Sequence, residues 1–137
     1  MLFRSFIVAT ANDISLLPLE IIRKGRFDEI FFLGLPTFDE RKMIFQIHLS
    51  LIRPETWQSY DLILLAQSTE NFSGAEILQS IIEAMHIAFY EKREFMTEDI
   101  LFGIKQIIPL AQVDKEKIEL LQNWAISGRI RLASKLI

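Results

Sequence analysis

The stretch FIVATANDISLLPLEIIRKGRFDEIFFLGLP, residues 6–36, decides what kind of fold the chain can adopt. Residues 3–10 and 30–33 are short runs of aromatic and branched aliphatic side chains, typical of strands that a parallel sheet buries on both faces. Residues 18–22 between them predict a short helix, because proline suits a first helical turn. A strand, a helix and a strand in about 30 residues form a βαβ-like unit. Since two strands make no independent sheet, the stretch predicts the edge of a larger sheet.

The composition fits a globular protein and excludes several classes of site. The chain has 137 residues, half of them hydrophobic, so it can bury a core. Its formal net charge of −3 argues against a generic nucleic-acid binder, whose surface is basic. The absence of cysteine excludes disulfides, a thiolate nucleophile and cysteine-ligated zinc. No apolar run reaches the roughly 18 residues of a transmembrane helix, so we expect no membrane span.

After Pro36 the sequence pattern becomes helical. Capping residues and prolines predict five helices. They cover residues 39–52 (capped by Asp39 or Thr37), 60–67, a segment that opens with the capping box Ser73-Gly74-Ala75-Glu76, 97–108 and 114–127. The basic tail, residues 128–137, is a further helix candidate. The predicted fold is therefore mainly α, with a short α/β remnant of two strands followed by a helical bundle.

Helical periodicity also predicts which faces are buried. In the first predicted helix the apolar stripe consists of Ile44, Ile47, His48 and Leu51. In the third it consists of Ile77, Ile81, Ala84, Met85, Ala88 and Phe89.

Several catalytic motifs are missing from the chain. A phosphate-binding G-x-x-x-x-G-K-[ST] loop does not occur, and neither does H-E-x-x-H. Glu83 and His86 form a single E-x-x-H pair, whereas di-iron bundles need two such pairs and two further glutamates. We therefore read Glu83 and His86 as a helix-surface pair and expect no metal site.

Three sequence motifs resemble a known family. Residues 6–36 resemble the second region of homology of AAA-type ATPases, where an apolar strand ends in asparagine and a GRFD-like segment follows. Downstream, RKMIFQIHL (residues 41–49) resembles the start of that family's helical lid, and NFSGAEI (residues 71–77) resembles its second nucleotide-sensing motif. The resemblance is greatest to an AAA-domain protein of unassigned function that plastid and cyanobacterial genomes encode. It implies a plastid stroma or a bacterial cytoplasm as the location.

The resemblance assigns catalytic roles to three residues. Asn12 would be the first sensor, which orients the attacking water and touches the γ-phosphate. Arg23 and Arg26 would be arginine fingers that act on the nucleotide of a neighbouring subunit, because a guanidinium stabilises spreading phosphate charge. Without the resemblance, Asn12 is an ordinary turn or cap residue, and the two arginines belong to a solvated basic turn.

The resemblance also assigns nucleotide-binding roles. His48 would lie near the adenosine, although its place on the apolar stripe fits a satisfied core histidine equally well. Gly74 and Ala75 would let a helix N-terminus approach the nucleotide through backbone contacts, since helix N-termini favour anions. An ordinary capping box explains Ser73 and Glu76 without any ligand.

The family's phosphate-binding loop, Mg²⁺-binding acidic motif and pore loop lie upstream of these motifs and do not occur in this chain. The resemblance implies ATP as the cofactor, with Mg²⁺ held by the upstream segment, and a homo-oligomeric ring of AAA subunits as partner. The expected domains are a core edge (residues 1–36), a lid (37–110) and a C-terminal helical extension (111–137). We expect a C-terminal AAA fragment that contributes sensors and trans-acting fingers to ATP hydrolysis but does not hydrolyse ATP alone.

Two other functions are open at this stage. The helical part can instead be a non-catalytic, lid-like interaction module that binds a protein substrate or adaptor. A DNA-binding bundle is the weaker alternative, because it would rely on three tail cations, Arg129, Arg131 and Lys135, in a net acidic chain.

Overall fold

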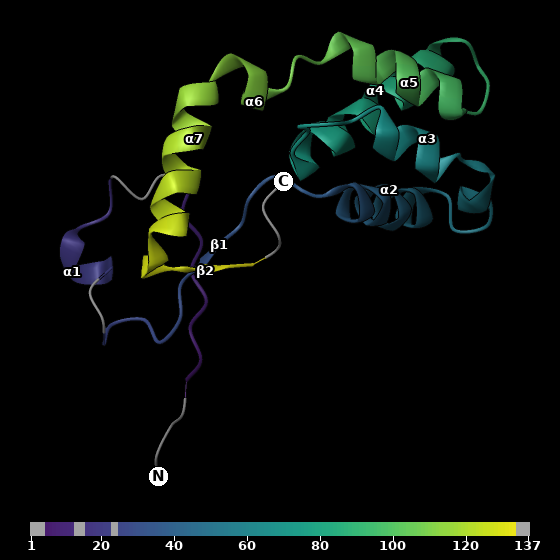
Figure 1. The fold of residues 1–137 in the computed structure, drawn as a ribbon. Helices are drawn as coiled ribbons and strands as arrows, with labels where there is room; N and C mark the ends of the chain where they lie inside the picture. Colours follow the sequence, from purple (N-terminus) through teal and green to yellow (C-terminus); the bar gives the residue numbers. More distant parts are fainter. Residues whose placement is uncertain (1–4, 13–15, 23–24, 134–137) are drawn as a thin grey trace. The chain divides into compact units, whose positions relative to one another are not determined.

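Most of the chain is helical, as the capping residues and prolines predict. Figure 1 shows the computed structural model, which describes residues 5–12, 16–22 and 25–133. The chain divides into two compact units, residues 1–30 and residues 31–137. The mainly α fold with a two-stranded sheet confirms the predicted fold class.

Among the described residues of the first unit, Leu19–Ile22 form a short helix, α1. It agrees with the helix predicted over residues 18–22. The strand predicted over residues 3–10 is wrong for residues 5–10, the part that the structure describes. These residues have no regular secondary structure. Phe6, Ile7 and Val8 are largely exposed there. Without a neighbouring strand, an apolar run has no partner for its backbone groups and cannot form a sheet.

The second unit contains the remaining elements of the described chain. In chain order they are β1 (Phe31–Phe32), α2 (Phe38–Ile52), the 3₁₀ turn η2 (Trp57–Ser59), α3 (Leu62–Gln67), α4 (Gly74–Tyr90), α5 (Thr97–Gln106), α6 (Leu110–Val113), α7 (Lys115–Trp124), the π-helical turn η3 (Ala125–Arg129) and β2 (Arg131–Leu132). All five predicted helices are present, and their ends differ from the prediction by at most a few residues. The sequence pattern did not predict η2 or α6.

The two strands form a small parallel sheet. Phe31 is paired with Arg131 and Phe32 with Leu132. The Ala133 N–H also donates to the Phe32 carbonyl oxygen at 2.9 Å. The expected strand over residues 30–33 is therefore present, but its partner comes from the tail that was a helix candidate. Parallel pairing needs a long crossover, and here the helices between the two strands provide it.

A side-chain cap fixes the start of α2. Thr37 Oγ1 accepts a hydrogen bond from the Glu40 N–H, and the Glu40 carboxylate accepts one from the Thr37 N–H. This reciprocal pair satisfies two backbone donors that the helix itself leaves unpaired. Of the two caps predicted for α2, Thr37 is confirmed, whereas Asp39 lies inside the first turn of the helix.

The buried face of α2 differs from the predicted stripe. Arg41, Phe45 and Leu49 are the buried residues of this helix. Ile47 and Leu51, which were predicted to be buried, are exposed. Apolar residues occur on more than one face of α2, so the periodicity alone does not select the face that packs.

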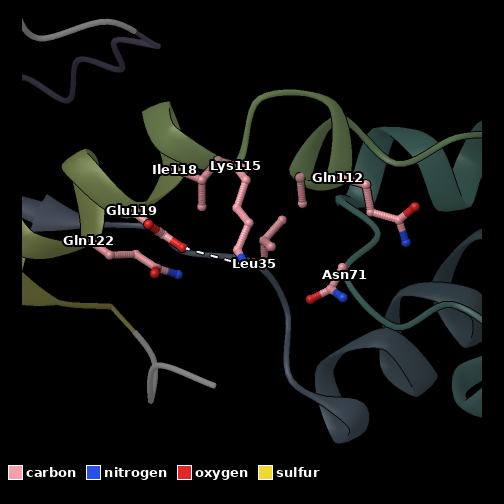
Figure 2. Close-up of a pocket in the computed structure, with 8 residues that line it drawn as sticks. Leu35, Asn71, Gln112, Lys115, Ile118, Glu119 and Gln122 are labelled. Atoms are coloured by element: carbon pink, nitrogen blue, oxygen red, sulfur yellow. Dashed lines mark ion pairs between the residues drawn. The ribbon is translucent and has the colours of Figure 1, made fainter.

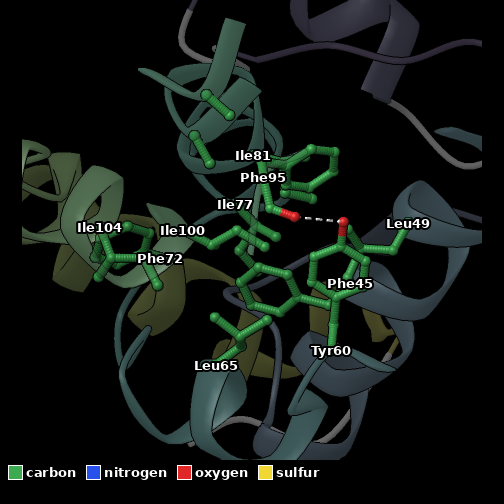
Figure 3. Close-up of a cluster of buried hydrophobic side chains, with 12 residues drawn as sticks. Phe45, Leu49, Tyr60, Leu65, Phe72, Ile77, Ile81, Phe95, Ile100 and Ile104 are labelled. Carbon is green, nitrogen blue, oxygen red and sulfur yellow. Dashed lines mark hydrogen bonds between the residues drawn. The ribbon is translucent and has the colours of Figure 1, made fainter. Parts of the chain in front are cut away.

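The hydrophobic core lies within α2–α5 and the segments that connect them (Figure 3). From α4 it takes Ile77, Ile81, Ala84 and Ala88, which confirms most of the predicted stripe. Phe89, predicted as the last member of this stripe, is 85% exposed, whereas Ala88 is 2% exposed. Successive side chains of a helix point about 100° apart, so Phe89 lies away from the buried face. Tyr60 anchors the core to the α4–α5 connection, since its hydroxyl donates to the Phe95 carbonyl oxygen at 2.9 Å.

A buried arginine fixes the segment that leads into the bundle. The Arg41 side chain donates from Nε to the Ala66 carbonyl oxygen at 3.1 Å and from Nη1 to the Pro36 carbonyl oxygen at 2.9 Å. Burial lowers the pKa of Arg41, and nearby Glu70 opposes this effect. The guanidinium therefore ties the connection before α2 to the end of α3.

A carboxylate and an arginine fix the start of α5. Both Nη atoms of Arg93 donate to the Asp99 carboxylate at 2.7 Å, and the Met96 N–H donates to it at 2.8 Å. The hydrogen bonds from Arg93 lower the pKa of Asp99 and prevail over burial, which would raise it. Asp99 thus caps α5 and ties it to the preceding loop.

Helices α4 and α5 pack closely at Gly103, which leads to a prediction about stability. A Cβ atom added at Gly103 would lie 2.7 Å from the Ser80 carbonyl oxygen and 3.2 Å from Glu83 Cβ. A backbone oxygen cannot move aside without shifting its helix, so we expect Gly103→Ala to lower the free energy of unfolding by about 1–3 kcal/mol. Urea denaturation followed by circular dichroism measures this change.

Gly74→Ala is the matched control for this prediction. A Cβ atom at Gly74 would meet only Ile44 Cδ1, at the ordinary contact distance of 3.8 Å. We expect this variant to stay within about 0.5 kcal/mol of the parent chain. If Gly103→Ala proves as stable as Gly74→Ala, the close packing of α4 and α5 does not limit the size of residue 103.

Candidate functional site

The first turn of α4 carries two of the residues that the sequence singled out, Gly74 and Ala75. The capping box predicted at this turn is confirmed. Ser73 Oγ accepts from the Glu76 N–H at 3.3 Å, and Glu76 Oε2 accepts from the Ser73 N–H at 2.7 Å and from the Ser73 hydroxyl at 2.9 Å. The Ile77 N–H donates to the Ser73 carbonyl oxygen at 3.1 Å.

These bonds leave two backbone donors open at the start of α4. No described residue accepts a hydrogen bond from the Gly74 or the Ala75 N–H. Gly74 is half-buried and Ala75 is exposed. Because the helix dipole places partial positive charge at this end, the turn can accept an anion through its backbone.

Helix α2 packs beside this turn. The Ile44 Cδ1 atom lies next to Gly74, as the 3.8 Å contact of an added Cβ indicates. His48 follows Ile44 by one helical turn, so the two side chains share a face of α2. His48 is half-buried. The structure thus brings Gly74 close to the face of α2 that carries His48.

The predicted catalytic residues belong to the first unit. Asn12 lies in a bend and is exposed. Arg26 is exposed in a turn, directly after Gly25, whose φ of 98° favours glycine. Arg23 lies outside the described residues. The candidate residues are therefore divided between two units, with Asn12 and Arg26 in one and His48, Gly74 and Ala75 in the other.

The second unit also contains a shallow cavity of ≈ 440 Å³ (Figure 2). Its lining combines amide, charged and apolar side chains, with Lys115 paired to Glu119 at 3.8 Å. The residues around it are Leu35, Asn71, Ala111, Gln112, Lys115, Ile118, Glu119 and Gln122. Asn71, which begins the NFSGAEI motif, has a φ of 64°, a left-handed conformation that asparagine tolerates. The cavity is open and contains no buried, unpaired polar side chain among the residues described.

One contact of the first turn of α4 was not predicted from the sequence. Glu76 Oε1 accepts a hydrogen bond from the Leu110 N–H at 2.7 Å, although 34 residues separate the two. The capping-box pattern explains one carboxylate oxygen of Glu76 only. The sequence feature nearest to this contact is Pro109. A proline ends the preceding helical pattern, so the Leu110 N–H that follows it has no partner within a helix.

No metal site and no membrane span emerge from the described ranges. Residues 5–12, 16–22 and 25–133 contain no group of three or more histidine and carboxylate side chains that could hold a metal ion. Glu83 instead accepts a hydrogen bond from Gln79 at 2.8 Å. Within the same residues no helix has both the length and the apolar character needed to cross a bilayer.

Comparison with known proteins gives two groups of relatives. The first contains proteins named "Uncharacterized AAA domain-containing protein ycf46". The chain is 63% identical to the one from Trieres chinensis and 57% identical to the one from Guillardia theta, each over 129 residues. These matches cover 94% of this chain and 26% of each relative. The relatives are encoded in plastid genomes, which supports a plastid origin for this chain.

The second group is more distant. The chain is 37% identical over 102 residues to the proteasome-activating nucleotidase of Sulfurisphaera tokodaii, which covers 74% of this chain and 26% of that protein. No protein-family model matches the chain. No solved structure matches it either. In both groups of relatives, the chain spans about a quarter of the length of the curated proteins it matches.

Proposed function

Because this chain carries the sequence of the C-terminal part of an AAA-type ATPase, we propose that it completes the ATP site of an AAA module. It supplies sensors and trans-acting arginine fingers there and does not hydrolyse ATP alone. The observation that carries the proposal is the 57–63% identity to AAA-domain proteins over 129 residues. The family implies nucleotide binding, and the absence of a phosphate-binding loop from this sequence implies that another segment holds the β- and γ-phosphates.

The second unit contributes the lid in this proposal. The two open N–H groups at Gly74 and Ala75 would donate to the nucleotide, and His48 would lie near the adenosine. The hydrogen-bond pattern supports this role, since backbone donors at a helix N-terminus bind phosphate well. Mg²⁺ would be held by the segment that carries the phosphate-binding loop, because no described cluster of this chain fits a metal.

The first unit contributes the catalytic residues. Asn12 would orient the attacking water, and Arg23 and Arg26 would reach the nucleotide of the next subunit. The exposure of Asn12 and Arg26 supports roles outside a core. AAA proteins commonly form rings, so a homo-oligomeric ring in the plastid stroma is the proposed assembly. Residues 1–36 would be the core edge, 37–110 the lid and 111–137 a C-terminal extension.

Replacing Asn12 tests the proposed site. In a ring in which this chain is joined to its phosphate-binding segment, we expect Asn12→Ala to slow ATP turnover about 100-fold, because positioning dominates phosphoryl transfer. The affinity for ATP should change much less. Steady-state hydrolysis and binding of a fluorescent ATP analogue give the two quantities. An Asn12→Ala ring with unchanged turnover would rule out the sensor role.

A second candidate function is a lid-like module that binds a protein adaptor. It is favoured by the exposed apolar side chains of Met43, Ile47 and Leu51, which follow one another at intervals of four residues on α2. Such a stripe on one helix face is suited to another protein surface. Binding of a partner without nucleotide, lost on Leu51→Asp, would support this function over the first.

A further inference from the structure

We propose that Arg41 is a positioning residue, whose guanidinium clamps the segment that enters the helical bundle and so sets the direction in which the lid leaves the core edge. The inference rests on the proposed function, in which residues 1–36 are the core edge and residues 37–110 the lid. It deepens that function by naming the side chain that acts at the boundary between them. Arg41 touches no nucleotide in this proposal and acts through the position of the lid.

The clamp consists of two hydrogen bonds from one side chain. Arg41 Nη1 donates to the Pro36 carbonyl oxygen at 2.9 Å, and Nε donates to the Ala66 carbonyl oxygen at 3.1 Å. Pro36 precedes α2, whereas Ala66 lies in the last turn of α3, where a helix leaves carbonyl oxygens without backbone donors. Arg41 therefore joins the entry of α2 to the end of α3.

The peptide group between Pro36 and Thr37 is held on both of its edges. Its carbonyl oxygen accepts from Arg41, and its N–H, which belongs to Thr37, donates to Glu40 Oε2 at 2.7 Å. Because a peptide group is planar, bonds on its two edges fix its orientation. Arg41 and Glu40 both belong to the start of α2, so the end of the entry segment moves with that helix.

The burial of Arg41 indicates that these bonds, and not packing, account for an arginine at this position. The residue is 5% exposed, and no carboxylate of the described chain forms an ion pair with it. Taking a charge out of water costs free energy that only hydrogen bonds or an opposite charge offset. An apolar side chain of similar length would fill the same space without that cost. The guanidinium therefore contributes the two directed bonds.

The clamp shortens the link between β1 and the bundle. β1 ends at Phe32, and Pro36 is already fixed to the bundle, so the backbone can change direction only over residues 33–35. These residues have no helix or strand hydrogen bonds of their own to hold them. A displacement of about 1 Å in a functional group can lower a rate about 100-fold, so the direction that Arg41 imposes on the lid matters to ATP turnover.

Replacing Arg41 with methionine tests the clamp without any nucleotide. Methionine fills most of the space but donates no hydrogen bond. Because a bond from a charged donor is lost, we expect the hydrogen-exchange rate of the Thr37 amide to rise about tenfold in Arg41→Met. NMR-detected exchange on the 137-residue chain measures this rate. The core amides of Ile81 and Ile104 should stay within about twofold of the parent chain.

Two further variants keep this test decisive. Lys42→Met removes the neighbouring cation and introduces the same side chain, and it should leave the Thr37 exchange rate unchanged. If Arg41→Met does not fold, Arg41→Gln replaces it. Glutamine is polar but too short to reach both carbonyl oxygens, so the same rise at Thr37 is expected. A rise of equal size at Ile81 and Ile104 would show a general loss of stability and overturn the positioning role.

ATP turnover separates the clamp from the proposed function. In a ring in which this chain is joined to its phosphate-binding segment, Arg41→Met should lower kcat about tenfold, whereas Lys42→Met should not change it. Unchanged exchange at Thr37, with an intact core, overturns the clamp. Faster exchange with an unchanged kcat, in a ring that Asn12→Ala does slow, overturns the positioning of the lid. If Asn12→Ala leaves turnover unchanged, the proposed sensor fails, and the exchange rate of Thr37 alone decides whether the clamp stands.

Discussion

Replacing Arg26 with alanine is expected to lower ATP turnover by about 10³–10⁵-fold in a ring in which this chain is joined to its phosphate-binding segment. The reason is that a permanently charged, planar guanidinium stabilises the charge that spreads over the transferring phosphate. Arg26 is exposed in a turn that the positive φ of Gly25 shapes, so its side chain is available to a neighbouring subunit. The affinity for ATP should change little, because the proposed finger would act mainly in the transition state.

Three controls make the Arg26 experiment specific. Lys105→Ala removes an exposed cation from α5 and should leave turnover unchanged. Arg26→Lys keeps the charge but loses the planar fork, so we expect it to recover only part of the activity. Rings that mix Arg26→Ala subunits with subunits lacking a working phosphate-binding loop should regain turnover at the junctions where an intact finger meets an intact loop. Failure of such rings to regain any turnover would contradict a finger that acts in trans.

The starts of α2 and α4 could be predicted from local signals, because each depends on residues within one turn of the helix. Thr37 and Ser73 each cap a helix through a bond to the third residue that follows, and both helices begin where these residues indicate. The face that α2 buries could not be predicted in the same way. It depends on what packs against the helix, and Arg41 joins Phe45 and Leu49 on the buried side because its donors find the carbonyl oxygens of Ala66 and Pro36.

The strands also depend on a partner that local sequence patterns do not predict. The apolar run at residues 30–33 has the composition of a strand and contains β1, yet the similar run at residues 5–10 is unpaired. Pairing is a property of two segments, and the partner of β1 is Arg131–Leu132, which lie about a hundred residues later and have no strand-like periodicity of their own. The hydrogen bond from Leu110 to Glu76 could not be predicted from the sequence either, because it also depends on two segments that are far apart in the chain. It joins a backbone N–H, which has no sequence signature, to the Glu76 carboxylate, which the sequence pattern assigns to the capping box with Ser73.

The largest effect on stability is expected at Phe45. Its side chain is fully buried, and it belongs to the cluster that also contains Leu49, Tyr60 and Leu65 (Figure 3). Truncating a buried phenylalanine removes its transfer free energy and leaves a cavity that the neighbouring helices fill only in part. We therefore expect Phe45→Ala to lower the free energy of unfolding by about 3–5 kcal/mol. That is a large share of the roughly 5–15 kcal/mol that holds an ordinary domain together.

Ile47→Ala on the same helix is the matched control, because it truncates an apolar side chain that is 50% exposed. We expect this variant to lose less than about 1 kcal/mol. Urea denaturation followed by circular dichroism gives both values. Tryptophan fluorescence gives an independent probe, to which Trp57 contributes from its place against the core and Trp124 from α7. The periodicity of the sequence favoured Ile47 as the core residue of α2, whereas the structure favours Phe45. The comparison therefore decides between the two faces. A larger loss at Ile47 would show that α2 packs through the face the sequence indicates, and equal losses would contradict a core that depends on Phe45.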